Sequence, residues 1–409
     1  MRTAKPELPD GAIRPDYAGG GIVNLMRSLG DACGATSLPY APLTSAALEK
    51  AGLDGTARST ARHIVLLLID GLGYRYLQRQ GAGGHLHRHL QARLTSVFPS
   101  TTTSAVTTCL TGLAPQQHAL TGWHMYFSEL DAIAAVLPLK PRGGGVFETP
   151  DALPERLFGY TPFAKRIARR CVFISPQAIA GSTFTRYHIG NGGSAAEVRG
   201  YQTLPELFAQ TAAALREAAT PAYIYAYYPE LDALAHAHGI DSAPVAAQFA
   251  ALDEAFGAFL ADIAGSDTLV LACADHGFID SPPERQIDLA RHPALAATLA
   301  RPLCGERRVA YCYVAPRQAA RFEARAAAAL GHCADIFSSH ALIEQGWFGP
   351  GAANPRLASR IGDYVIVMRE NWTLLDWMAG EARYRQIGVH GGLSADEMHV
   401  PLIAARCDA

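Results

Sequence analysis

The chain has 409 residues, of which 49 % are hydrophobic and 18 % charged, a composition that excludes wholesale disorder. Its 35 basic and 37 acidic residues give a formal charge of −2, so no broad attraction to nucleic-acid polymers or anionic membranes is built in. An anionic substrate must be captured locally. The apolar runs are too short to cross a bilayer, and no signal peptide is visible, so we expect a cytoplasmic protein without a membrane partner.

Four short segments have the composition of strands that are buried on both faces. Residues 63–69, 171–175, 222–228 and 268–272 are rich in β-branched and aromatic residues and show little alternation with polar ones. Helical periodicity lies between them, as in residues 246–263. Strands that alternate with helices predict an α/β fold over residues 1–409, with a mostly parallel sheet and helices on both of its faces.

Two stretches fit this alternation less well. Residues 123–200 are rich in proline and glycine, and residues 281–377 carry a mixture of short patterns. We interpret both as insertions with approximate boundaries in a single domain. Insertions on such a sheet commonly cover the ligand site, so we expect these two to form a cap.

Acidic residues and histidines follow three of the four predicted strands, and one more histidine lies near the end of the chain. These residues are Asp70, then Asp232 and His236, then Asp275 and His276, and finally His390. Ligands of open parallel sheets bind beyond the carboxyl ends of the strands. Taken singly, each residue has a simpler explanation as a turn aspartate, a helical ion pair or a loop histidine. Together, three carboxylates and three imidazoles form a set that suits zinc, although manganese and iron use the same residue types.

A cluster of hydroxyl residues opens a predicted helix in the segment FPSTTTSAVTTCL. Pro99 ends a strand-like run, residues 100–104 supply N-cap side chains, and residues 105–110 continue as a helix. Backbone N–H groups and the helix dipole favour an anion at such a helix start. A well-capped helix would explain the segment by itself, but a neighbouring divalent metal would lower the pKa of one hydroxyl and make it a nucleophile.

The ordered motifs IDG, FPSTT, LDALAH, ADHG and VHGG resemble those of the nucleotide pyrophosphatase/phosphodiesterase family of the alkaline phosphatase superfamily. The resemblance covers roughly residues 63–130, 222–280 and 385–404. Each motif is weak alone, but their order and separation are specific. The resemblance implies an alkaline-phosphatase-like core and a metal-dependent hydrolase that cleaves phosphodiester or pyrophosphate bonds in small phosphate esters or nucleotides.

In that family, two zinc ions lie beside a threonine nucleophile. The resemblance implies that this residue is Thr102, because it lies four residues after Phe98 of the FP step, with Thr101 and Thr103 as alternatives. It also implies that one zinc is held by Asp70, Asp275, His276 and the oxygen of Thr102, and the other by Asp232, His236 and His390. Two metals about 4 Å apart can clamp a phosphoryl group during in-line displacement. A phosphothreonine intermediate, later hydrolysed by water, is therefore expected.

The sequence departs from the family pattern at Trp123. Characterised members carry there an asparagine that contacts a non-bridging phosphate oxygen. Tryptophan has a single donor, so this contact is either weaker or passes to His124. Alternatively, Trp123 stacks on a base, lines an apolar leaving-group pocket or only packs. The physiological substrate and the oligomeric state stay open.

Two other functions compete with this hypothesis. A phosphomonoesterase or phosphonate hydrolase could use the same site, but monoesterases of the superfamily typically use serine and a third, magnesium-binding site, and no acidic residue is visible beside FPSTT to build one. A non-catalytic metal-binding protein of this fold is disfavoured, because a scaffold does not require a hydroxyl at an open coordination position.

Overall fold

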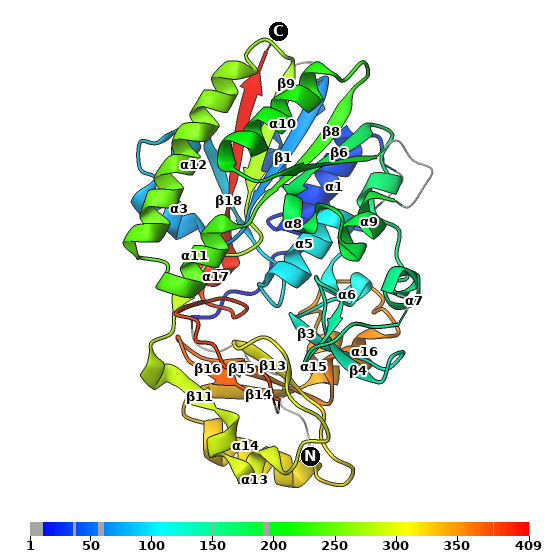
Figure 1. Ribbon diagram of the computed structural model, residues 1–409, viewed down its shortest axis with the longest axis vertical. Helices are drawn as coiled ribbons and strands as arrows, with labels where there is room; N and C mark the ends of the chain where they lie inside the picture. Colours follow the sequence, from blue (N-terminus) through cyan, green and yellow to red (C-terminus); the bar gives the residue numbers. More distant parts are fainter. Residues whose placement is uncertain are drawn as a thin grey trace.

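The computed structural model describes residues 11–35, 38–55, 61–148, 150–190, 196–378 and 380–408, and its main sheet has seven strands in the upper half of Figure 1. In spatial order these are β2 (Leu90–Thr95), β18 (His399–Cys407), β9 (Thr268–Cys273), β1 (His63–Ile69), β8 (Ala222–Tyr228), β6 (Arg170–Pro176) and β7 (Glu197–Tyr201). The five strands from β9 to β7 are parallel, whereas β18 runs antiparallel to both of its neighbours. The predicted α/β fold with a mostly parallel sheet is confirmed.

The central strands β1 and β9 are buried along their whole length, as their apolar composition requires. Every residue of β1 is buried, and the four predicted strands agree with β1, β6, β8 and β9 to within one residue at each end. Helices cover both faces of the sheet (Figure 1). On one face, α10 (Leu204–Arg216) packs on α12 (Ala243–Asp262), and the ring centroids of Phe208 and Phe259 are 5.0 Å apart. Elsewhere, α1 (Ile22–Ala32) packs on α5 (Thr102–Thr111). In the described part of the chain, no helix combines the length and apolarity that a membrane crossing needs.

A second sheet of seven strands, with antiparallel pairing, lies below the first in Figure 1. Its spatial order is β14 (Ala334–Ser338), β15 (Tyr364–Met368), β13 (Val309–Cys312), β12 (Cys304–Gly305), β3 (His124–Phe127), β4 (Ala132–Ala135) and β5 (Lys140–Pro141). Both predicted insertions contribute strands to it. The boundary of the first insertion differs, because β6 and β7 lie within residues 123–200 and belong to the main sheet. The five consecutive buried residues of β6 suit a strand inside the main sheet, and the proline- and glycine-rich part of the predicted insertion precedes this strand.

Two short strand pairs and the remaining helices complete the described structure. The pairs are β10 (Ile279–Asp280) with β17 (Gly388–Val389), and β11 (Gln286–Asp288) with β16 (Thr373–Leu375). The helices are α2 (Ser45–Ala51), α3 (Tyr74–Gln80), α4 (His85–Arg88), α6 (Pro115–His118), α7 (Leu153–Leu157), α8 (Gln177–Ala180), α9 (Thr183–Ile189), α11 (Glu230–His238), α13 (Pro293–Ala296), α14 (Ala319–Leu330), α15 (Ser339–Glu344), α16 (Leu357–Ile361) and α17 (Ala395–Met398). Four 3-10 turns are η1 (Pro150–Ala152), η2 (Phe163–Lys165), η3 (Pro283–Arg285) and η4 (Leu289–Arg291).

Candidate active site

The six predicted ligands meet at one edge of the main sheet. The strands β9, β1 and β8 are adjacent and parallel, so the residues that follow them emerge side by side. Asp70 follows β1, Asp275 and His276 follow β9, and α11 follows β8 and carries Asp232 and His236. His390 follows β17, which pairs with β10 directly after the β9 loop. This pairing brings a residue from far along the chain to the same edge.

The first cluster consists of Asp70, Asp275 and His276, whose potential ligand atoms lie within 4.8 Å of one another. His276 Nε2 is 3.4 Å from Asp70 Oδ1 and 3.3 Å from Asp275 Oδ2, and all three side chains are buried. These two carboxylate oxygens have no hydrogen-bond partner among the described residues. Burial and the Asp275 charge raise the pKa of Asp70 well above its usual value, whereas burial lowers the pKa of His276. Two buried carboxylates this close together repel each other, and a bound cation would offset this repulsion.

Outer contacts orient the first cluster. The Tyr227 hydroxyl donates to Asp70 Oδ2, and two backbone N–H groups donate to Asp275 Oδ1 at 2.9 and 3.1 Å. His276 Nδ1 lies 3.1 Å from the Gly277 carbonyl oxygen. A proton on Nδ1 satisfies that carbonyl and leaves the lone pair of Nε2 directed at the two unpartnered oxygens, which is the arrangement of a metal-binding imidazole.

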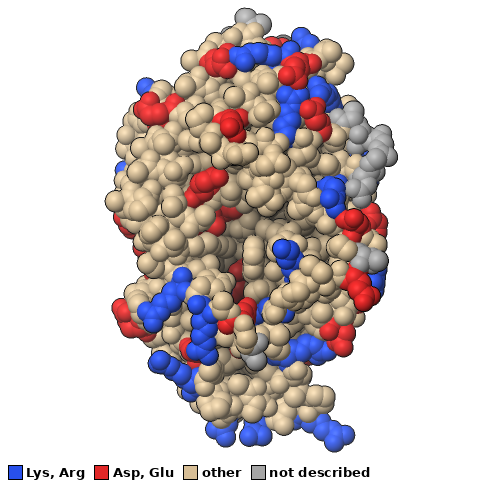
Figure 2. Space-filling model, in the orientation of Figure 1, with Lys and Arg blue, Asp and Glu red and all other residues tan. Residues whose placement is uncertain are grey.

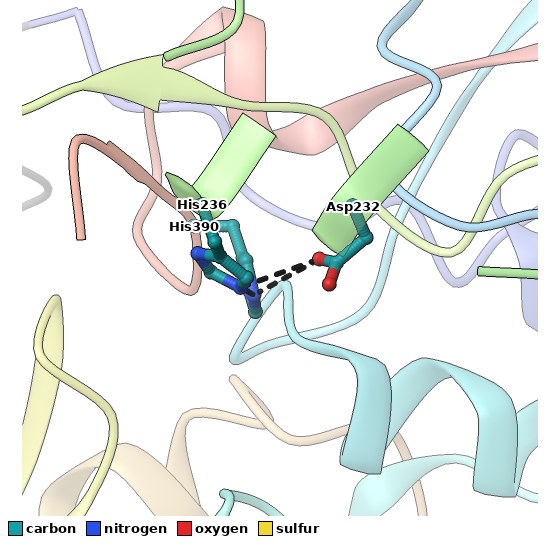
Figure 3. A group of neighbouring side chains, drawn as sticks. All are labelled: Asp232, His236 and His390. Carbon is teal, nitrogen blue, oxygen red and sulfur yellow. Dashed lines mark hydrogen bonds and ion pairs between the residues drawn. The ribbon is translucent and has the colours of Figure 1, made fainter. Parts of the chain in front are cut away.

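The second cluster consists of Asp232, His236 and His390, which point toward one another in Figure 3. Asp232 Oδ1 is 3.4 Å from His236 Nε2 and 3.6 Å from His390 Nε2, and it has no hydrogen-bond partner in the described structure. His236 Nδ1 lies 2.8 Å from the Gly388 carbonyl oxygen, which leaves its Nε2 lone pair free. Burial lowers the pKa of His236 to about 4, and burial also lowers the pKa of His390 well below its usual value. Both imidazoles are therefore neutral at pH 7, the form that binds a metal.

Thr102 lies beside the first cluster at the start of α5. Its Oγ1 is 3.2 Å from His276 Nε2, and the ring of His276 stacks on that of His390 with centroids 3.7 Å apart, so the two clusters adjoin. Thr101 is the N-cap residue, but its side chain does not cap the helix, and its hydroxyl donates to Glu306 instead. Thr103 is buried, and its hydroxyl has no partner in the described part of the chain. Of the three threonines, Thr102 is the one whose hydroxyl contacts a predicted ligand among the described residues.

A cavity of about 390 Å³ opens over Thr102 and the second cluster. Figure 2 shows this face hollowed at mid-height, with acidic atoms visible inside the hollow. Thr102 and the whole second cluster line the cavity, and residues of the second sheet and its loops form the opposite wall. The two residues predicted to contact substrate, Trp123 and His124, both line it. Trp123 is 39 % exposed, and burial lowers the pKa of His124 to about 4.

Glu306 also lines the cavity and was not predicted from the sequence. Its Oε1 accepts hydrogen bonds from Thr101 Oγ1 at 2.7 Å and from the Trp123 backbone N–H at 2.6 Å, and burial raises its pKa to about 7. No acidic residue was expected beside FPSTT, and the structure differs, because Glu306 contacts this segment from a distant part of the chain. Glu306 lies 205 positions from Thr101, between the short strands β12 and β13, where no sequence signal marks it.

A third group, His85, Asp253 and Glu254, has the composition of a metal site but a structural role. The Asp253 carboxylate accepts the backbone N–H groups of His85 and Leu86 at 2.8 and 2.7 Å. These are orphan donors at the start of α4, so Asp253 satisfies a helix terminus.

The model of the family described as type I phosphodiesterase / nucleotide pyrophosphatase matches residues 64–393, which contain all six predicted ligands and Thr102. No curated protein matches the chain.

Solved structures show where the same fold occurs. Murine ectonucleotide pyrophosphatase/phosphodiesterase 5 is 17 % identical, with a TM-score of 0.64 over 83 % of this chain and 87 % of that one. The human ectonucleotide pyrophosphatase/phosphodiesterase 5 is 16 % identical, with a TM-score of 0.63 over the same shares. Phosphonoacetate hydrolase from Sinorhizobium meliloti 1021, solved with phosphonoformate, is 17 % identical, with a TM-score of 0.59 over 85 % of this chain and 90 % of that one. At these identities the likeness is one of fold, and that fold is the alkaline-phosphatase-like one expected from the sequence.

Proposed function

The chain belongs to the type I phosphodiesterase / nucleotide pyrophosphatase family, and on this premise we propose that it hydrolyses phosphodiester or pyrophosphate bonds at a two-zinc site with Thr102 as the nucleophile. The observation that carries the proposal is the convergence of six metal-binding side chains, in two adjoining clusters, beside one threonine hydroxyl. The substrate class is a small phosphate ester or a nucleotide.

The donor set supports two divalent cations. Each cluster offers buried carboxylate oxygen without a hydrogen-bond partner among the described residues, and imidazoles with depressed pKa values. Asp70, Asp275 and His276, together with Thr102, would hold one ion, and Asp232, His236 and His390 the other. When bound, zinc ions lower the pKa of a coordinated hydroxyl and neutralise charge that develops on the phosphoryl oxygens. Manganese and iron fit the same residue types.

Thr102 supplies the attacking oxygen. Its deprotonated Oγ1 forms a bond to phosphorus while the bond from phosphorus to the leaving oxygen breaks, and the leaving group departs with that electron pair. The first-turn N–H groups of α5 receive no side-chain cap from Thr101, so they are available to non-bridging phosphoryl oxygens. Water then attacks the phosphothreonine, and Thr102 is released with its oxygen.

A substitution at Thr102 tests the proposal most directly. We expect Thr102→Ala to reduce turnover of bis(p-nitrophenyl) phosphate by at least about 10³-fold. Most of the bound metal should be retained, because all six aspartate and histidine ligands remain. Thr102→Ser keeps a hydroxyl and should retain measurable activity. Undiminished turnover by Thr102→Ala would remove the nucleophile assignment.

A substrate panel separates the proposed function from its alternatives. Dinucleotides, nucleotide sugars, phosphomonoesters and phosphonates, including phosphonoacetate, are compared at equal metal loading. Preference for diesters or pyrophosphates supports the proposal, and preference for monoesters or phosphonates assigns the same site to a different reaction. Full metal content without hydrolysis of any substrate would leave a metal-binding protein of this fold.

A further inference from the structure

Glu306 places a carboxylate next to the nucleophile segment, where a hydrolase of anionic substrates would be expected to avoid one. Glu306 lines the same cavity as Thr102 and the second cluster. Its Oε1 accepts from the hydroxyl of Thr101, the residue directly before the proposed nucleophile. The carboxylate therefore lies close to the place where a phosphoryl group would bind.

The carboxylate is held in position by two donors. The Thr101 hydroxyl and the Trp123 backbone N–H both donate to Oε1, and Thr101 makes this bond instead of capping α5. A backbone N–H cannot turn away as a flexible side chain can, so the two hydrogen bonds hold the carboxylate of Glu306 in one orientation.

Glu306 forms no ion pair with any of the described residues. Burial raises the pKa of Glu306 more than the charge of the adjacent Arg307 lowers it. The nearby Arg142 is paired with Glu381 at 3.0 Å. Arg307 lies over the rings of Trp377 and Tyr384, 5.5 and 4.7 Å from their centroids.

We propose that Glu306 is a specificity-determining residue that repels phosphoryl groups with two negative charges and thereby favours the single charge of a phosphodiester. The inference rests on the proposed function and names the substrate class within it. A monoester or free phosphate carries one more negative charge than a diester near neutral pH, and that charge would lie in a cavity of reduced dielectric constant beside a fixed carboxylate. The repulsion grows with the substrate charge, whereas the attack by Thr102 is common to both substrates.

The test compares two substrates with the same leaving group. Methyl p-nitrophenyl phosphate carries one negative charge, and p-nitrophenyl phosphate carries two. Glu306→Gln keeps an oxygen that can accept from Thr101 and Trp123 and removes only the charge, and Glu306→Asp keeps the charge. Assays at pH 8.5 leave the wild-type carboxyl ionised, because its pKa is about 7.

We expect Glu306→Gln to raise kcat/KM for the monoester relative to the diester by about tenfold or more, and Glu306→Asp to keep the wild-type ratio to within about threefold. An equal change for both substrates in Glu306→Gln would assign Glu306 a structural role and overturn the proposal. Magnesium-stimulated monoester hydrolysis that Glu306→Gln abolishes would overturn it in favour of a third metal site.

A binding measurement separates failure of this inference from failure of the proposed function. Calorimetry compares inorganic phosphate with dimethyl phosphate on the metal-loaded wild type and on Glu306→Gln. Tighter phosphate binding by Glu306→Gln, by about tenfold, supports the charge effect even if neither chromogenic substrate is hydrolysed. Unchanged phosphate affinity contradicts it whatever the enzyme hydrolyses.

Discussion

The Nε2 atoms of His236 and His390 lie 3.2 Å apart, although 154 positions separate the two residues in the sequence. Two imidazoles can approach in this way because both are neutral, and the Gly388 carbonyl holds the proton of His236 on Nδ1. With a cation between them, both Nε2 atoms could serve as ligands. The close approach of the pair therefore supports the proposal of a metal site at the second cluster.

Removal of His390 should empty the second cluster and spare the first. We expect His390→Ala to reduce bound zinc from about two ions per chain to about one, with at least about a hundredfold loss of diester hydrolysis. Metal content is measured by mass spectrometry after dialysis. His340, which is exposed and lies opposite Glu344, provides the control, because His340→Ala removes an imidazole far from the cavity. Two retained ions in His390→Ala would contradict the ligand assignment.

Tyr227 should tune the first cluster without binding metal itself. Its hydroxyl donates to Asp70, so Tyr227→Phe frees a carboxylate that the protein otherwise holds in place. We expect metal affinity at this cluster to fall by about tenfold, measured by chelator competition. Tyr225 is the matched control, because it lies on the same strand, is buried, and its hydroxyl has no partner in the described structure. Equal affinities of the Tyr227→Phe and Tyr225→Phe variants would contradict this role.

Metal binding should release protons. Burial raises the pKa of Asp70 and of Asp232 in the metal-free protein, so these carboxyls hold protons at pH values where an ordinary aspartate has lost them. A metal needs the ionised form, and affinity should therefore decrease as the pH falls. His236, with a pKa of about 4, competes for protons only in more acidic solution.

Calorimetric titration of the metal-free protein with zinc, in buffers of different ionisation enthalpy, measures the protons released. Asp232→Asn should lower their number, since it removes one of the two carboxyls. Heats that do not depend on the buffer would show that the carboxyls are already ionised.

The buried ion pair between Arg308 and Glu397 should stabilise both the fold and the loop that carries His390. Arg308 Nε lies 3.0 Å from Glu397 Oε1, and the same carboxylate accepts the Gly392 backbone N–H at 2.8 Å. Arg308→Met leaves a buried carboxylate without its cation, and we expect the free energy of unfolding to fall by about 3–5 kcal/mol. Urea denaturation measures this change.

The exposed pair of Arg216 and Asp262 is the control for this prediction. Arg216→Met should cost less than about 1 kcal/mol, because both partners are more than half exposed. Similar losses in the Arg308→Met and Arg216→Met variants would show that the buried pair has no special role.

The sequence predicts the main sheet well because strands that are buried on both faces have continuous apolar, β-branched segments that are easy to recognise. The prediction for β8 matches its observed bounds, and the six side chains that meet in the two clusters could be named because each belongs to a recognisable motif. The second sheet could not be predicted, since strands such as β12 have only two residues and carry no periodicity. Glu306 and Tyr227 were missed for a related reason. Their roles come from contacts with distant residues: Glu306 lies between two short strands, and Tyr227 lies within a strand whose apolar composition indicates only burial.

The strand β18 lies between β9 and β2, and both of these neighbours precede it by more than a hundred residues. During synthesis on the ribosome, β9 therefore waits with one edge unpaired until residues 399–407 emerge. His390 emerges only shortly before them. The proposed second metal site therefore lacks one of its three ligands until the main sheet is ready to close, whereas the proposed ligands of the first cluster are already synthesised.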